Sequence, residues 1–85
     1  MQKEIIFTSH ALLRISERGA TKENVVEAIR IGMKEPAQRG LFQYRLNLEY
    51  KKEWAGQFYS VQQVVPVVAE EKNRMVVVTV YVFYF

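Results

Sequence analysis

The single histidine of this chain stands at a regular spacing from two arginines. His10, Arg14 and Arg18 lie four residues apart within the segment SHALLRISERG, residues 9–19. In a helix a step of four residues turns by roughly 40°, so we expect a slanting row on one side, here called the basic row. Guanidinium groups bind phosphate oxygens through paired, permanently charged hydrogen bonds, and an imidazole transfers protons near neutral pH. The basic row therefore has the residue types that cleave a phosphodiester without a metal ion.

The same row also has a structural interpretation. Arg14 and Arg18 then pair with Glu17 or with carboxylates on a neighbouring sheet, as surface cations commonly do. His10 is then a partly buried residue near the first turn of the helix. The two interpretations differ in whether the row stays free to meet a ligand.

The residue types missing from the chain exclude several kinds of site. It has no cysteine, which excludes disulfides, thiolate zinc sites and cysteine nucleophiles. With one histidine and no aspartate, one subunit lacks the parts of a Ser-His-Asp triad, a two-histidine metal helix and an EF-hand loop. We therefore expect no metal and no cofactor, and any chemistry must use His10, glutamate, arginine, lysine, tyrosine or backbone groups.

The composition is that of one small domain. The 85 residues, 49% of them apolar, suffice for a single core over residues 1–85, without a repeat or linker that marks a second domain. The first residues, MQKEIIF, hold only a three-residue apolar run, and no stretch approaches the roughly 20 apolar residues that span a bilayer. We therefore expect a cytoplasmic protein with no membrane partner. The net charge of +3 is a mild excess that would help an anionic partner.

Helical periodicity predicts two short helices before residue 37. Thr8 and Ser9 are both suitable N-caps for the first helix, which runs to about Arg18 and stops at Gly19. Thr21 caps the second helix, KENVVEAIRIG, which stops at its final glycine, residue 32. The apolar stripes of the two helices are Ala11, Leu12 and Ile15, and Val25, Val26 and Ile29. The basic row runs along the shoulder of the first stripe.

After residue 37 the pattern alternates, which predicts strands. The segment LFQYRLNLEYK, residues 41–51, has one apolar and one polar face. The segments FYSVQQVVPVVAE and RMVVVTVYVFYF, residues 58–70 and 74–85, are rich in β-branched and aromatic residues and flank a polar turn, so they predict a hairpin. The expected fold is α+β, with two N-terminal helices packed on an antiparallel sheet of three to four strands. EIIF, residues 4–7, is a further short candidate strand.

Two features of the hairpin stay open at this stage. Pro66 cannot donate a ladder hydrogen bond, so its strand is an edge strand, bulged or split there. In the last strand, the even-numbered valines of residues 76–82 predict one core face and leave Thr79 and Tyr81 pointing outward. The odd-numbered residues 75–83 form a rival face that is only slightly less apolar.

Other candidate functional residues lie on the predicted sheet. Arg45 is on the polar face of its strand. Aromatic side chains stack on bases in proteins that bind single strands, but they also fill the cores of small domains. The aromatic residues to which both interpretations apply are Tyr44, Tyr50, Trp54, Phe58 and Tyr59.

Several of these features together resemble a known family. The run H-A-x-x-R-x-x-x-R-G over residues 10–19, the YRL strand and the VVVTVY strand are similar to the domain-of-unknown-function 4258 family. The resemblance covers residues 8 to about 81. That family looks like a relative of the RelE/ParE and BrnT type toxins, small metal-independent ribonucleases with N-terminal helices against an antiparallel sheet. The resemblance therefore implies a RelE-like fold.

The resemblance also implies an activity for the chain. His10 would be the acid/base residue, Arg14 and Arg18 the stabilisers of the phosphate and transition state, and Tyr81 or Thr79 a helper on the last strand. Arg45 would be a further phosphate contact. The reaction would be attack of the ribose 2′-hydroxyl on its own phosphate, which leaves a cyclic phosphate and a free 5′-hydroxyl. A glutamate such as Glu17 or Glu49 is a candidate second acid/base, although the spacing singles out neither.

The implied partners are RNA and an antitoxin protein. The alternative hypothesis is a non-enzymatic domain that binds RNA or protein through its sheet edge. The terminal strand ends in Phe83, Tyr84 and Phe85 without a charged residue, so a second subunit of a homodimer is a further expected partner there. Salt discriminates between these modes, because phosphate binding weakens steeply with salt and aromatic strand pairing does not.

Overall fold

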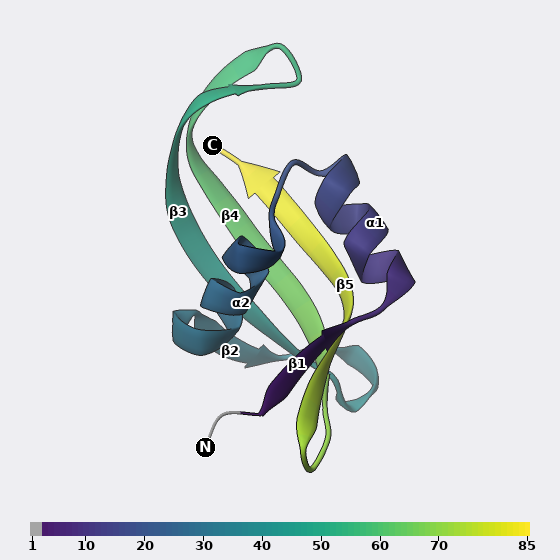
Figure 1. The fold of residues 1–85 in the computed structure, drawn as a ribbon. Helices are drawn as coiled ribbons and strands as arrows, with labels where there is room; N and C mark the ends of the chain where they lie inside the picture. The colour runs from purple at the N-terminus through teal and green to yellow at the C-terminus, as the bar shows by residue number, and fades with distance from the viewer. Residues whose placement is uncertain (1–2) are drawn as a thin grey trace.

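Residues 3–85 are described by a computed structural model, and they form two helices and five strands (Figure 1). The helices are α1 Ser9–Glu17 and α2 Lys22–Ile31, and a short 3-10 turn, η1, covers Gln38–Gly40. The strands are β1 Glu4–Phe7, β2 Met33–Pro36, β3 Phe42–Trp54, β4 Gln57–Glu70 and β5 Arg74–Tyr84. Within the described residues no helix is long and apolar enough to cross a membrane.

The strands form one mixed sheet in the order β1-β5-β4-β3-β2. β1 runs parallel to β5, with Glu4 opposite Arg74, and the other neighbours are antiparallel. The expected antiparallel sheet of three to four strands is therefore wrong, although the class remains α+β. The candidate strand EIIF is confirmed as β1, whereas β2 was not expected, because its four residues are too few for a clear alternating pattern.

The helices begin and end where the capping residues predict. Thr8 is the N-cap of α1, because its Oγ1 accepts a hydrogen bond from the Ala11 amide at 3.0 Å. Thr21 caps α2 in a reciprocal capping box with Asn24. Gly19 follows α1 with a φ of +77°, a left-handed conformation that suits glycine.

Both helices pack on the same face of the sheet, which we call the helix face (Figure 1). The buried core joins α1 and α2 to the central strands through Ala11, Ile15, Val25, Ala28, Ile29, Tyr44, Val64, Val68, Val77 and Val80. Leu12, which the sequence places in the apolar stripe, is 42% exposed, so that assignment is wrong. α1 lies beside β5 and contacts the sheet through a narrower stripe, Ala11 and Ile15.

A bulge in β5 settles which of its residues point to the core. Thr79 pairs with Val67 and Val77 pairs with Val68, so Val78 is an extra residue in the ladder. Before the bulge Val77 faces the helices, and after it Val80 does. Neither of the two alternating patterns expected from the sequence is therefore correct along the whole strand. Thr79 and Tyr81 lie on the opposite face, which we call the open face.

Pro66 lies in the middle of the sheet, so the interpretation of its strand as an edge is wrong. β4 is the central strand, and Pro66 is fully buried. It pairs with Val80 of β5, whose carbonyl accepts a hydrogen bond from outside the β4–β5 ladder. Towards β3 the pairing is interrupted between Val67 and Val64, as expected for a residue that has no N–H to donate.

Candidate functional site

The basic row lies on α1 with its three members in different environments. His10 is exposed in the first turn, so the interpretation of a partly buried histidine is wrong. Arg14 forms an ion pair with Glu17 at 2.5 Å, as the structural interpretation expects for this arginine. Arg18 is partly buried and donates from Nη1 to the Val80 carbonyl at 2.7 Å. Along the basic row the side chains therefore change from solvent-exposed at His10 to packed against the sheet at Arg18.

Arg18 connects the helix to the open face of the sheet. β1 covers the outer edge of β5 only from Arg74 to Val77, and beyond it Arg18 reaches the carbonyl of Val80 at that edge. Its guanidinium carbon lies 5.4 Å from the centre of the Tyr81 ring, a cation–π distance. Tyr81 is 46% exposed on the open face. The structure therefore brings these two sequence-predicted residues together.

Arg45 and Thr79 lie on the same face as Tyr81. The register pairs Tyr81 with Val65, and Arg45 lies beyond Val65 on the next strand. Because strands are about 4.8 Å apart, the backbones of Arg45 and Tyr81 are separated by roughly 10 Å. Thr79 lies one row along, opposite Val67. These residues share a surface without touching one another.

A hollow of about 430 Å³ opens beside Tyr81 on this face. Thr79 and Tyr81 line it from β5, and Gln43 lines it from β3. Arg39 lines it from η1, which covers this part of the open face. Sequence reasoning missed Arg39, because nothing in the sequence between the second helix and β3 indicates that this loop folds back over the sheet.

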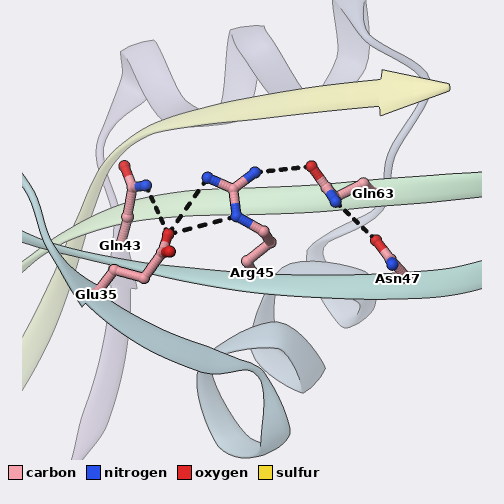
Figure 2. A network of polar contacts seen from close by, with 5 residues as sticks. All are labelled: Glu35, Gln43, Arg45, Asn47 and Gln63. Carbon is pink, nitrogen blue, oxygen red and sulfur yellow. Dashed lines mark hydrogen bonds and ion pairs between the residues drawn. The ribbon is translucent and has the colours of Figure 1, made fainter.

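A chain of polar side chains crosses the open face from β2 to β4 (Figure 2). The carboxylate of Glu35 accepts from Gln43 at 2.9 Å and from Arg45 at 3.3 and 3.4 Å. Arg45 also donates to Gln63 at 2.8 Å, and Gln63 donates to Asn47 at 2.8 Å. The network holds the guanidinium of Arg45 in place and leaves two of its five N–H groups without a partner among residues 3–85.

The electrostatics of this network favour a charged carboxylate. The hydrogen bond from Gln43 lowers the pKa of Glu35 below its ordinary value, and the nearby Arg45 guanidinium lowers it further against the opposing effect of desolvation. Glu35 therefore stays ionised at neutral pH and neutralises part of the charge of Arg45. Arg18 beside this face and Arg39 over it add further positive charge.

Phe83 is a second aromatic residue that the sequence did not assign to the site. It follows Tyr81 by two residues on the open face, opposite Gln63, and is 44% exposed. Phe83 alternates with Tyr81 along the strand and could have been assigned with it. The sequence alone did not decide which of the two alternating sets of residues faces the core, so this pattern could not be used. The other aromatic candidates lie elsewhere: Tyr44 is buried, Phe58 is exposed, and Tyr50, Trp54 and Tyr59 pack around Tyr84.

Together these residues offer two exposed rings and several cations on one face. Aromatic rings stack on unpaired bases, while arginines bind the phosphates that join them. His10 lies apart from this group, because eight residues of helix place it about 12 Å from Arg18 along the axis. The structure therefore gathers Arg18, Arg45, Thr79 and Tyr81 on or beside one surface, while His10 and Arg14 lie further along α1.

Comparisons of the chain with protein-family models, with curated protein sequences and with solved structures find no match.

Proposed function

We propose that this chain binds single-stranded RNA on the open face of the sheet, beside α1. The observation that carries the proposal is the placement of the Arg18 guanidinium against the exposed Tyr81 ring, next to the hollow that Thr79 and Arg39 line. One base stacks on Tyr81, and a neighbouring base stacks on Phe83. Arg18 and Arg39 contact the phosphates, and Arg45 directs its two free N–H groups to an acceptor on the RNA. Such an activity is consistent with a cytoplasmic location.

The energies of these contacts make the proposal testable with single substitutions. Stacking of one base on an aromatic side chain contributes about 1–3 kcal/mol, which corresponds to roughly 5- to 100-fold in affinity. Arginine–phosphate contacts add a term that falls as salt rises, with a logarithmic slope of about 0.7 per phosphate neutralised on a single strand. Loss of a ring should therefore weaken binding at every salt concentration, and loss of a cation should also flatten the salt dependence.

The test is the binding of a fluorescent single-stranded RNA to the wild type and to Tyr81→Ala, measured by anisotropy. We expect about 5- to 100-fold weaker binding of the variant. Phe58→Ala is the matched control, because Phe58 is also an exposed aromatic residue but lies in the β3–β4 hairpin. Equal affinities of the wild type and Tyr81→Ala would contradict the proposal.

A second candidate function is metal-independent cleavage of the bound RNA. It is favoured by the exposure of His10, which lies one helical turn from Arg14 on α1. In this reaction His10 accepts the proton of a ribose 2′-hydroxyl, whose oxygen forms a bond to the adjacent phosphorus. The bond to the 5′-oxygen breaks, giving a 2′,3′-cyclic phosphate, and the leaving 5′-oxygen takes a proton from water to become a 5′-hydroxyl. Arg14, one turn from His10, stabilises the charge of the phosphorane, while Arg18 and Tyr81 hold the neighbouring part of the RNA strand.

Cleavage is tested with a labelled RNA in the presence of EDTA. We expect His10→Ala to abolish cleavage while it binds RNA as the wild type does, because His10 lies outside the stacking surface. An RNA with a single 2′-deoxy position should resist cleavage only at that position. Cleavage at that position, or an unchanged rate in His10→Ala, excludes this mechanism and leaves the binding function to be judged on its own test.

The resemblance to the domain-of-unknown-function 4258 family supports the same second candidate. On this proposal the chain acts as the ribonuclease toxin of a toxin–antitoxin pair. An antitoxin protein then covers the exposed aromatic end of β5, where Phe83 and Phe85 are 44% and 63% exposed. Co-expression with the protein of the neighbouring gene should relieve growth inhibition if the chain is such a toxin.

A further inference from the structure

A second hollow lies on the helix face, on the other side of the sheet from the proposed RNA site. It has a volume of about 330 Å³ and opens between β1, α2 and the β4–β5 end of the sheet. Its apolar walls are Ile5 of β1, Ile29 of α2 and Met75 of β5. The volume is near the lower end of that of small-molecule pockets, which are mostly apolar with a few polar groups that orient the ligand.

The inner wall of this hollow carries a polar pair, Tyr44 and Glu70. Tyr44 is only 6% exposed, and its hydroxyl donates to Glu70 Oε2. Lys34 Nζ lies 2.7 Å from the same oxygen. The hydrogen bonds from Lys34 and Tyr44 lower the pKa of Glu70 below its ordinary value, and the charge of Lys3 lowers it further. Glu70 is therefore ionised, and Lys34 neutralises it.

Two further cations line the hollow without such a partner. Lys3 and Arg30 both line it, and neither has an ion pair within residues 3–85. Three cations and one carboxylate give the lining a net charge of +2. A concave surface with one sign of charge and apolar walls concentrates ligands of the opposite sign.

We propose that this hollow binds a small amphipathic anion, whose carboxylate lies between Lys3 and Arg30 and whose short apolar chain lies against Ile29 and Met75. The positive charge selects the anionic group, and the apolar walls select a ligand with a hydrocarbon part. The site lies on the opposite face of the sheet from Tyr81, so it does not depend on the proposed RNA binding.

The test is an NMR titration of the full chain with octanoate as the probe, with the methyl signals of Ile29 and Met75 as the readout. A ligand of about ten heavy atoms is expected to bind with a dissociation constant of millimolar order. Octanol lacks the charge and inorganic phosphate lacks the hydrocarbon, so both should bind more weakly than octanoate. Equal shifts with octanol, equal affinity for phosphate, or no saturable shift with octanoate would overturn the proposal.

A pair of charge variants checks the location of the site. Arg30→Gln should weaken octanoate binding by about three- to tenfold, because it removes one of the two unpaired cations. Lys52→Gln removes the same charge from the β3–β4 hairpin, which is far from the hollow, and should leave the affinity unchanged. Equal weakening in both variants would show that octanoate responds to net charge only and would overturn the assigned site. The RNA affinity of Arg30→Gln provides an independent readout of the open face.

Discussion

At the scale of single residues, Tyr84 anchors the turn between the two helices. Its hydroxyl donates to the Arg18 carbonyl and accepts from Gln62, which also donates to the Gly19 carbonyl at 3.1 Å. The Trp54 ring stacks on Tyr84 at 5.5 Å. Because Arg18 carries the contact to Tyr81, the packing around Tyr84 also positions the candidate site.

Gly19 is the residue at which this packing leaves no space. A Cβ at this position would lie 2.6 Å from the Trp54 ring and 2.8 Å from the Tyr84 hydroxyl, at a φ of +77°. We expect Gly19→Ala to lower the free energy of unfolding by about 2–4 kcal/mol through backbone strain and overpacking. Gly56→Ala is the control, because its φ is +85° but a Cβ there meets nothing within 4 Å. Urea denaturation should show a loss of only about 1 kcal/mol for the control, and equal losses would contradict the packing argument.

Glu70 makes the stability depend on pH. Its folded-state pKa is lowered by Lys34 and Tyr44, so its contribution is present above the ordinary value of 4.5 and is lost as the pH falls through the lower folded-state value. We expect Glu70→Gln to be about 1–2 kcal/mol less stable than the wild type at pH 7. The difference should shrink on acidification below about pH 4.5. Urea unfolding from pH 7 to pH 3 measures both curves, and parallel curves would refute the assignment.

At the scale of secondary-structure elements, Thr8 links the start of α1 to the bulge in β5. Its hydroxyl accepts from the Ala11 amide and donates to the Val78 carbonyl at 3.3 Å, and its own amide donates to the Val77 carbonyl at 3.1 Å. Val78 is the extra residue of the bulge. One residue therefore holds both the helix that carries the basic row and the strand that carries Tyr81.

The two helix caps should consequently differ in their effect on stability. Thr8→Ala loses the cap and the bond to Val78, so we expect the free energy of unfolding to fall by about 1–2 kcal/mol. Thr21→Ala loses only an exposed cap, so we expect a fall of about 1 kcal/mol or less. Ser16→Ala in exposed α1 should change the free energy of unfolding by less than about 0.5 kcal/mol. Thermal and urea unfolding rank the three variants, and a Thr21 effect larger than that of Thr8 would contradict this account.

The elements also show how much could be predicted from sequence. Both helices and the long strands follow from caps and periodicity, since these are local signals. The strand EIIF could be recognised locally, but its parallel partner lies 70 residues later in the chain, Glu4 with Arg74, so no local pattern reports the pairing. The bulge at Val78 changes the core-facing set in mid-strand, which is why alternation alone left Phe83 unassigned. The spacing of the basic row was readable, but the ion pair of Arg14 and the contact of Arg18 with Val80 depend on tertiary packing.

At the scale of the whole molecule, the sheet has one covered face, and the outer edge of β5 is only partly paired. β1 pairs with β5 as far as Val77, and α1 lies along the rest of β5. At this edge the side chain of Arg18 donates a hydrogen bond to the carbonyl of Val80. Uncovered strand edges pair with other chains, and a charged side chain on the edge is one way in which proteins prevent this. In a homodimer formed through β5, a strand of the second subunit would therefore compete with Arg18 for the Val80 carbonyl.

Removing Arg18 should therefore promote self-association. In Arg18→Ala the Val80 carbonyl loses its donor, and the exposed rings of Tyr81 and Phe83 lie next to the freed edge. We expect sedimentation at increasing concentration to show stronger association of this variant than of the wild type. Arg14→Ala is the control for reduced electrostatic repulsion. It removes the same charge from the same helix, but the side chain of Arg14 pairs with Glu17 and not with the edge of β5.

Association through strand edges and aromatic rings should persist at high salt, where RNA binding through arginines weakens. If both variants sediment alike, or if the association disappears with salt, Arg18 does not protect this edge.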